Sequence, residues 1–394
     1  MRNKWTVIDF FSGAGGMSCG FALQEDFEIV RAVDAQFGKP SAGKGKLQCN
    51  STYERNIGVK PINLDLSQAS SDEVVANLNL EPGFQLDVMI ACPPCTGFSR
   101  ANPLNHKRDD ARNGLVAKSA EIALALRPRV VLMENARELL QGNYRHHFER
   151  FKLQLESGGY RVSGACHMLT RFGLPQVRER ALIVAVDESL SFKTLDSLWS
   201  GFEFNAESTT VETAIRNLPT QEDPCHVFPA FKDETVAKRL AAIPPSGGSW
   251  LDLARNPETR HLLTNAMRAN WESGRIGSYP DVYGRMSWDR PAPTIKRECG
   301  HIGNGRYAHP EENRLCSVRE MAVLNGFPRD YRFERAALSN LYRHIGDAVP
   351  PMIAYQLAWL CKWMFTGKRP SPGQILMPNY HLSENDLHRA LIVA

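Results

Sequence analysis

The chain lacks the features that would place it in a membrane or in an oxidising compartment. Nine cysteines in 394 residues are few and odd in number, which argues against a disulfide framework. One Cys-x-x-Cys pair occurs, Cys92 and Cys95, and no second pair completes the four ligands of a structural zinc site. The best candidate for a spanning helix, Val349–Phe365, is interrupted by Gln356 and Lys362, whereas a bilayer requires roughly 18 consecutive apolar residues. We therefore expect no metal site and a cytoplasmic protein.

The chain also lacks a strong net charge, repeats and low-complexity tracts. Its 47 Lys and Arg against 43 Asp and Glu leave a formal charge of +4, which allows nucleic acid as a partner without requiring it. Hydrophobic residues make up 43% of the chain, enough to bury a large core, so disorder is excluded for most of the length. The length predicts two domains, or one large domain with an insertion.

Short apolar runs alternate with helical patterns over the first 190 residues. The expected strands are Thr6–Phe11, Phe27–Val33, Leu86–Ala91, Val130–Glu134, Arg161–Met168 and Ala181–Val186. The helical patterns between them include Leu115–Leu126, which ends before Pro128, and Tyr144–Glu156, which ends at Gly158. This alternation predicts a doubly wound α/β sheet.

The alternating pattern of strands and helices ends after residue 187. Residues 188–316 are rich in Pro, Gly, Asn and Trp and show no sustained period, which indicates a smaller, irregular domain or a long insertion. Helical patterns return over Ser317–Leu324 and Ala348–Lys362, the second opened by consecutive prolines. We therefore expect a first domain over 1–187, a second over 188–316, and a return to the first over 317–366. The tail, 367–394, and a Gly/Lys insertion over 37–50 have no assigned role.

A glycine turn, Asp9–Gly16, follows the first expected strand. Glycines let the backbone turn sharply and approach a ligand at a helix N-terminus. The spacing is neither GxGxxG nor a phosphate loop, and such a turn alone is structural as often as functional. Asp34, at the end of the second strand, could accept hydrogen bonds from ribose hydroxyls, and Asp65 could close the pocket. The pattern favours a nucleoside-bearing cofactor without pyrophosphate.

Candidate catalytic residues follow later strands, at the edge where open α/β sheets bind ligands. Cys95 lies on a tight turn and is a candidate nucleophile; a structural cysteine and a redox pair are the other interpretations. Glu134 closes an apolar strand, which favours an acid–base group over a surface carboxylate. Arg178 and Arg180 point to one side of an extended segment, which suits phosphate or a base carbonyl, with an exposed charged edge as the alternative.

In this order, the motifs resemble the signatures of the bacterial DNA (cytosine-5) methyltransferase family. The matching segments are the FxGxGG turn Phe11–Gly16, Pro94-Cys95, Glu134-Asn135, the QxRxR segment Gln176–Arg180, Arg319–Pro328 and Gly346–Pro351. The resemblance covers roughly residues 5–187 and 317–365 and leaves the middle as the family's variable target-recognition region. The chain departs at Thr96, Ala136 and Asp347, where the family usually has Gln, Val and Asn. If Asp347 lies beside the amino-acid end of the cofactor, its carboxylate is expected to repel the cofactor's own.

The resemblance implies a Rossmann-like, S-adenosylmethionine-dependent enzyme that methylates carbon 5 of a flipped cytosine at a specific sequence in duplex DNA. Cys95 would add to carbon 6, Glu134 would hydrogen-bond N3 and the exocyclic amine, and Arg178 and Arg180 would hold the base carbonyl and a backbone phosphate. The implied cofactor-binding residues are Phe11, Gly13, Ala14, Gly15, Gly16, Asp34, Asp65, Leu66, Pro94, Asp347, Ala348 and Val349.

The substrate side rests on a loop and a basic stretch. Ser99–Leu115 is expected to be a lid over the flipped base, and residues 238–306 hold 11 Lys and Arg against 6 Asp and Glu, interleaved with aromatics; a solvated basic face is the alternative. The implied DNA-contacting residues are Ser99, Arg100, Arg112, Gln176, Thr294 and Arg297. We expect a monomer acting on double-stranded DNA at the nucleoid, and a cognate restriction endonuclease is a compatible partner. The rival hypotheses are a tRNA methyltransferase of the same fold and an inactive DNA-binding homologue.

Overall fold

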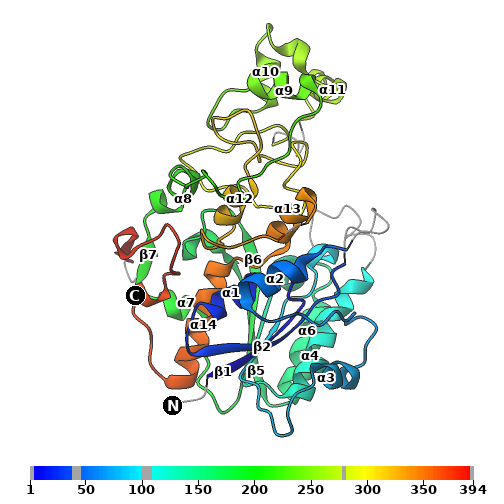
Figure 1. The fold of residues 1–394 in the computed structure, drawn as a ribbon, viewed down its shortest axis with the longest axis vertical. Coiled ribbons are helices and arrows are strands. Elements are labelled where there is room, and N and C mark those ends of the chain that lie inside the picture. The colour runs from blue at the N-terminus through cyan, green and yellow to red at the C-terminus, as the bar shows by residue number, and fades with distance from the viewer. Residues whose placement is uncertain (1–3, 38–45, 99–108, 277–280, 335, 391–394) are drawn as a thin grey trace.

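A six-stranded sheet organises the larger lobe of the computed structural model, which describes residues 4–37, 46–98, 109–276, 281–334 and 336–390 (Figure 1). The strands lie in the order β2-β1-β3-β4-β6-β5. They are β1 (Trp5–Phe10), β2 (Phe27–Val33), β3 (Val88–Ala91), β4 (Val130–Ala136), β5 (Tyr160–Met168) and β6 (Glu179–Asp187). All six expected strands are confirmed, with ends that differ by at most two residues.

One strand of this sheet runs against the others. β1 is parallel to β2 and β3, and β3 is parallel to β4, but β6 is antiparallel to both β4 and β5. The connection from β5 to β6, residues 169–178, holds only one short 3₁₀ turn. Because a parallel crossover requires about a dozen residues or more, this short connection favours an antiparallel neighbour.

Helices cover both faces of the sheet (Figure 1). The first face packs against α1 (Gly16–Ala22), α7 (Leu195–Trp199) and α14 (Pro351–Thr366), and the second against α3 (Ser71–Leu78), α4 (Leu115–Leu126) and α6 (His146–Ser157). Alternate residues of β1 supply the two cores: Val7 lies in the first and Ile8 in the second. Side chains of a strand alternate between faces, so burial on both sides produces the continuous apolar runs seen in the sequence.

The second lobe has its own hydrophobic core and short helices. Its elements are α8 (Val211–Ile215), α9 (Glu234–Ala241), α10 (Trp250–Arg255), α11 (Asn265–Glu272), α12 (Val318–Leu324) and α13 (Leu338–Asp347). Arg285, 2% exposed, donates to the backbone carbonyls of Leu240, Ile243 and His309 at 2.9–3.1 Å. This side chain satisfies carbonyl groups that a regular helix or sheet would pair, so the lobe can be irregular and still buried.

Some segments pack into a different hydrophobic core from the one that the sequence pattern suggests. α7 lies in a core of the sheet, and α12 and α13 lie in the core of the second lobe. The tail joins both lobes: β8 (Leu387–Arg389) pairs with β7 (Phe202–Phe204), and the Tyr380 hydroxyl donates to the Val323 carbonyl at 2.9 Å. The domain limits expected from the sequence stay a prediction. Among the described residues, no helix is both long and apolar enough to cross a membrane.

The remaining helices of the larger lobe lie beside the carboxyl ends of its strands. α2 (Cys49–Ile57) begins at the end of the 37–50 insertion, and α5 (Glu138–Gln141) follows β4 directly. The glycine turn after β1, the loop after β3 and the end of β4 therefore meet at one edge of the sheet, as expected for open α/β sheets.

Candidate active site

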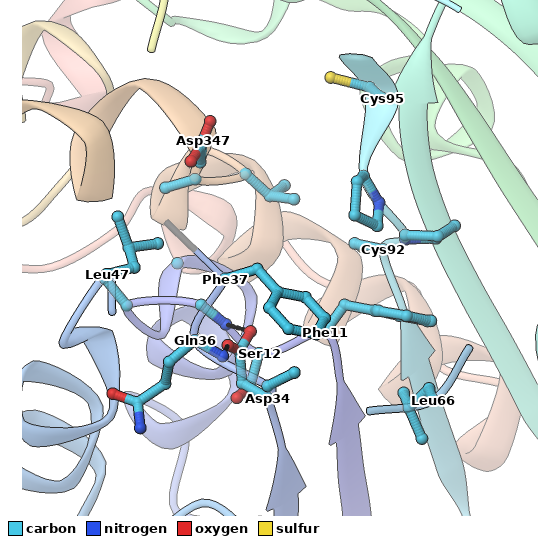
Figure 2. Close-up of a pocket in the computed structure, with 18 of the residues that line it drawn as sticks. Phe11, Ser12, Asp34, Gln36, Phe37, Leu47, Leu66, Cys92, Cys95 and Asp347 are labelled. Carbon is cyan, nitrogen blue, oxygen red and sulfur yellow. Dashed lines mark hydrogen bonds between the residues drawn. The ribbon is translucent and has the colours of Figure 1, made fainter. Parts of the chain in front are cut away.

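The glycine turn after β1 forms part of a cavity at this edge (Figure 2). Gly13 has a φ of 52°, in the left-handed region, and its N–H donates to Asp34 Oδ2 at 2.9 Å. Gly16 opens α1 against the segment that precedes α14, where an added Cβ would lie 2.3 Å from the Val349 carbonyl oxygen. Glycine is therefore required at these positions for a turn and for a close approach between α1 and that segment.

Asp34 occupies the position at the end of β2 that the sequence suggested. Its second carboxylate oxygen accepts from the Gln36 N–H at 2.5 Å, and the Cys49 thiol lies 3.5 Å away. Burial raises the pKa of this carboxyl, while the backbone donors of Gly13 and Gln36 oppose that rise. The half-buried carboxylate borders the cavity and is preorganised by backbone donors.

The cavity gathers eleven of the twelve predicted cofactor residues. The lining includes Phe11, Gly13, Ala14, Gly16, Asp34, Asp65, Leu66, Pro94, Asp347, Ala348 and Val349. Gly15 does not line it and instead lies behind the turn, where an added Cβ would meet the Tyr331 hydroxyl at 2.8 Å. In the view of Figure 2, Asp34 lies below Phe11, and Asp347 and Cys95 lie above it on opposite sides of the cavity.

Several lining residues were not assigned to the cofactor in the sequence. They include Asp9 and Ser12 of the glycine turn, Cys92 of the Cys-x-x-Cys pair, Arg297, which was assigned to DNA, and Met17, Gln36, Phe37, Leu47, Leu64, Ser67 and His344. Phe37 and Leu47 both lie within the Gly/Lys insertion, 37–50, and His344 of α13 contacts the Leu47 carbonyl through Nε2 at 2.8 Å. The place of the insertion, three residues after Asp34, was the available signal that its ends contribute to the pocket.

The ends of β3 and β4 hold the loop that carries Cys95. The Asn135 side-chain amide donates to the Pro93 carbonyl at 3.1 Å, and its oxygen accepts from the Ala136 N–H at 2.8 Å. The backbone N–H of Glu134 donates to Cys92 Sγ at 3.4 Å. Cys92 and Asn135 therefore both help to hold the loop that carries Cys95. Nothing in the sequence indicated this role for Asn135.

The carboxyl group of Glu134 lies beside two arginines, Arg178 and Arg180. Its Oε1 is 2.9 Å from Arg180 Nε and 3.9 Å from Arg178 Nη2. Arg178 also donates to the carbonyls of Ile295 and Ala348, each at 3.1 Å, so it links the sheet to two other segments. Burial, and next the neighbouring Arg180, lower the pKa of Arg178 to about 10, which leaves it charged at neutral pH. The two arginines hold the Glu134 carboxyl at the end of the strand.

Cys95 begins a 3₁₀ turn, Cys95–Gly97, and is half-buried. Burial raises the pKa of its thiol; Arg180 is the strongest opposing influence, and Glu134 adds to the rise. The residue borders the cofactor-type cavity and also a groove on its other side, which is lined by Ala136, Arg137, Glu138, Met168, Val177, Glu179, Arg180 and Thr294. Cys95 is therefore accessible from two separate binding spaces.

The groove beside Cys95 continues onto the second lobe. Its neighbouring hollow shares Val177 and Thr294 with it and adds Ser246, Gly247, Asp281, Ser287, Arg290, Pro291, Pro293 and Arg306. The Thr294 hydroxyl donates to the Val177 carbonyl at 2.5 Å, which holds the two lobes together at this point. Thr294 thus lies where the groove meets the neighbouring hollow, and its contact with DNA stays a prediction.

Two residues assigned to DNA in the sequence lie elsewhere. Gln176 is fully buried: its amide nitrogen donates to Asn325 Oδ1 at 2.8 Å and its oxygen accepts from the Ile295 N–H at 2.9 Å. Arg297 lines the cofactor-type cavity, 3.4 Å from Asp347. Sequence shows the charge or polarity of a side chain but not its direction. Burial argues against a direct DNA contact of Gln176, and the DNA contact of Arg297 stays a prediction.

The other DNA-contacting candidates are less informative. Arg112, half-exposed, donates to both carboxylate oxygens of Asp110 at 2.9 and 2.7 Å. Ser99 and Arg100 lie outside the described residues, as does most of the expected lid. Within the described part of the chain, one group of metal-capable side chains occurs away from the cavity: Asp109, His146 and His147.

Comparisons with known proteins agree with this geometry. The family model of the C-5 cytosine-specific DNA methylase matches residues 5–363. The type II methylase M.HgiDII of Herpetosiphon aurantiacus is 30% identical over 371 residues, which cover 92% of this chain and 96% of that protein. The type II methyltransferase M1.BsuMI of Bacillus subtilis is 28% identical, with 89% and 79% covered.

Solved structures show the same fold. An Escherichia coli prophage protein described as a DNA modification methyltransferase superposes with a TM-score of 0.61 at 21% identity, covering 92% of this chain and 99% of that one. The Dnmt2 methyltransferase of S. pombe superposes with a TM-score of 0.54 at 16% identity, covering 91% and 99%. Since the family model spans nearly all of both lobes, the chain belongs to the C-5 cytosine-specific DNA methylase family and is a DNA (cytosine-5) methyltransferase.

Proposed function

We propose that this methyltransferase modifies one cytosine, extruded from duplex DNA at a specific sequence, through a covalent adduct with Cys95. The observation that carries the proposal is the position of Cys95, which borders both the cavity and the groove. A base entering from the groove would meet the thiol on one side and the methyl donor on the other. Extrusion is required because carbon 6 is not accessible inside a stacked duplex.

The residues of the cavity fit S-adenosylmethionine. Asp34 offers a carboxylate for ribose hydroxyls, and Phe11 offers an aromatic face at the floor. The Ser12 hydroxyl is buried and, among the described residues, has no hydrogen-bond partner, which leaves it available to a ligand. When bound, S-adenosylmethionine supplies an electrophilic methyl group.

The side chains around Cys95 can carry the reaction. The Cys95 thiolate forms a bond to carbon 6, and the ring electrons move toward N3, where the Glu134 carboxyl donates a hydrogen bond or a proton. Carbon 5, now nucleophilic, bonds to the methyl carbon as the bond from that carbon to the donor sulfur breaks, which leaves S-adenosylhomocysteine. Loss of the carbon-5 proton to water restores the C5–C6 double bond as the C6–S bond breaks to release the Cys95 thiolate, and a proton taken up at N3 returns to Glu134. The thiol of Cys95 has a raised pKa in the free protein, so the thiolate must be generated when the substrate binds.

The arginines have different tasks in this proposal. Arg180 lies closer to Glu134 Oε1 than Arg178 does, at 2.9 against 3.9 Å, and it is the strongest influence that lowers the pKa of the Cys95 thiol, so it stabilises the thiolate. Arg178 donates hydrogen bonds to the carbonyls of Ile295 and Ala348 through its two terminal nitrogens. We therefore assign Arg178 chiefly to holding the site together, and Arg180 to the base carbonyl.

The groove is proposed to receive the DNA backbone and the second lobe to select the sequence. Arg290 is exposed and lines the hollow that adjoins the groove at Thr294, so it is a better candidate for a phosphate contact than Arg297, which faces the cavity. Arg306 donates to the carbonyls of Gly247 and Arg285 and supports the lobe instead. Phosphate contacts of this kind position a protein on DNA, whereas base-edge contacts select the sequence.

The relatives named as type II methylases support the modification half of a restriction-modification system. We propose a monomer that acts on chromosomal DNA in the cytoplasm, with a restriction endonuclease of the same specificity as its partner. The same relatives favour DNA over tRNA as substrate. Bisulfite sequencing of DNA from cells that express the enzyme would reveal the base, strand and site.

A trapping experiment tests the covalent mechanism. Duplex DNA with 5-fluorocytosine at the target site has no removable proton at carbon 5, so wild-type enzyme with S-adenosylmethionine should form an adduct that survives denaturation. Cys95→Ala should form none, and Cys92→Ala, the matched control, should still form it. Absence of the adduct with the wild type on DNA but its appearance on 5-fluorocytosine tRNA would favour the tRNA alternative; absence on both, without methyl transfer, would favour an inactive homologue.

A further inference from the structure

An ion pair lines the cavity at the position where the family usually has a neutral amide. Arg297 Nη1 lies 3.4 Å from Asp347 Oδ2, and Arg297 Nη2 donates to the Phe37 carbonyl at 3.4 Å. The two charged side chains expose 25% and 35% of their surface, so a ligand in the cavity can reach both.

The pair is looser than a full salt bridge. Charge-assisted hydrogen bonds between guanidinium and carboxylate have optimum distances of about 2.7–2.9 Å, and the separation here is longer. Arg297 Nε is buried and has no hydrogen-bond partner among the described residues. Both groups therefore keep hydrogen-bonding capacity that a ligand could use.

The cavity has a charged pattern that matches a zwitterion. Burial raises the pKa of Asp347 to about 6, and Arg297 is the strongest influence that opposes this rise. Burial also raises the pKa of Asp34, and Arg297 is one of the groups that oppose it. Asp34 and Asp347 lie on different sides of Phe11 in Figure 2. A ligand with its ribose at Asp34 can thus extend past Phe11 toward the ion pair.

We infer that Arg297 and Asp347 together bind the amino-acid end of S-adenosylmethionine, with the guanidinium on the α-carboxylate and the aspartate on the α-ammonium. The inference rests on the proposed function, because it names the groups that recognise its cofactor. It replaces the repulsion expected from the sequence, since the positive charge of Arg297 lies beside Asp347 and offsets it. It also gives Arg297, which lies within the basic stretch 238–306, a role in binding the cofactor.

Calorimetry with two ligands tests the inference. S-adenosylhomocysteine carries the amino-acid end, and 5′-methylthioadenosine lacks it while keeping the nucleoside. Arg297→Met and Asp347→Asn should each weaken S-adenosylhomocysteine binding by about tenfold to a hundredfold, as expected for a lost hydrogen bond to a charged group. Both variants should bind 5′-methylthioadenosine like the wild type, which also checks that they are folded.

Lys296→Met is the matched control, because it removes an exposed positive charge one residue away from Arg297. It should leave the affinity for both ligands unchanged. Equal weakening of both ligands in the Arg297 and Asp347 variants, or no weakening of either, would overturn the inference. Failure of the wild type itself to bind S-adenosylhomocysteine would instead overturn the proposed function.

DNA binding separates this role from the phosphate contact suggested by the sequence. Arg297→Met should leave the dependence of DNA affinity on salt concentration unchanged. A phosphate contact would lower the slope of log affinity against log salt by about one on loss of the arginine. That outcome would return Arg297 to the DNA surface and overturn the inference.

Discussion

The side-chain amide of Asn135 donates a hydrogen bond to the carbonyl oxygen of Pro93 at 3.1 Å. This contact ties the end of β4 to the loop after β3, two residues before the candidate nucleophile. Glu134 and Cys95 therefore come from adjacent strands whose ends brace each other. The spacing of acid and nucleophile depends on the sheet and not on either loop alone.

We expect Asn135→Ala to slow methyl transfer while cofactor binding survives. The substitution leaves a buried carbonyl without its donor, which costs about 1–3 kcal/mol, and it frees the loop that presents Cys95. Thermal unfolding, S-adenosylhomocysteine calorimetry and single-turnover kinetics would measure the three effects. A variant with wild-type single-turnover rate would show that the loop is held adequately by other contacts.

Cys95→Ala should abolish methylation without loss of the fold or of cofactor binding, since it removes the proposed nucleophile. Cys92→Ala should be much milder, because Cys92 accepts only a long hydrogen bond from the Glu134 N–H. Methyl transfer to duplex DNA is the measurement. Residual turnover of Cys95→Ala above about one part in a thousand would sink the assignment, and equal losses in both variants would revive a redox or metal role for the pair.

Glu134→Gln should keep DNA binding and slow chemistry by about 10²–10⁴-fold, the usual contribution of a general acid. The amide preserves the shape but cannot supply a proton to N3, and it loses the charge that pairs with Arg180 at 2.9 Å. Single-turnover rates at saturating DNA would show the effect. An unchanged rate would mean that Glu134 serves only to close its strand.

Asp9→Asn should change how stability depends on pH. Burial raises the pKa of Asp9 to about 7, although the Ser18 hydroxyl opposes this by donating to it at 2.6 Å. Between about pH 4 and pH 7 the folded state then binds a proton that the unfolded state has lost, so this group lowers stability as pH rises. The variant should match the wild type near pH 4 and become more stable than it above pH 7. Parallel unfolding curves of the two proteins from pH 4 to pH 8 would contradict the assignment.

Substitution of two arginines of the second lobe should have different effects, one on DNA affinity and the other on stability. Arg290 is exposed in the hollow that adjoins the groove, so Arg290→Ala should weaken binding to all DNA and lower the salt slope by about one while the melting temperature is kept. Arg285 is buried among backbone carbonyls, so Arg285→Ala should destabilise the lobe, because those carbonyls lose their donor. DNA titrations at several salt concentrations, with melting curves of both variants, would check this. A slope unchanged in Arg290→Ala would place the phosphate contact elsewhere.

The amino-acid sequence by itself determined the strands, the order of the motifs and the placing of Cys95 and Glu134 at one edge of the sheet. These features are local: apolar runs report burial on both faces, and a residue that ends a strand lies at the strand's end whatever surrounds it. Asp34 was placed correctly for the same reason.

Only the tertiary structure decided where long polar side chains point and which segments share a core. Gln176 and Arg297 looked alike in the sequence as candidates for DNA, yet the first is buried between the lobes and the second enters the cavity beside Asp347. Asn135 braces a residue 42 positions away, and α12 and α13 pack with the second lobe. Such contacts join segments far apart in the chain, and their directions follow from how the lobes pack, which no local pattern encodes.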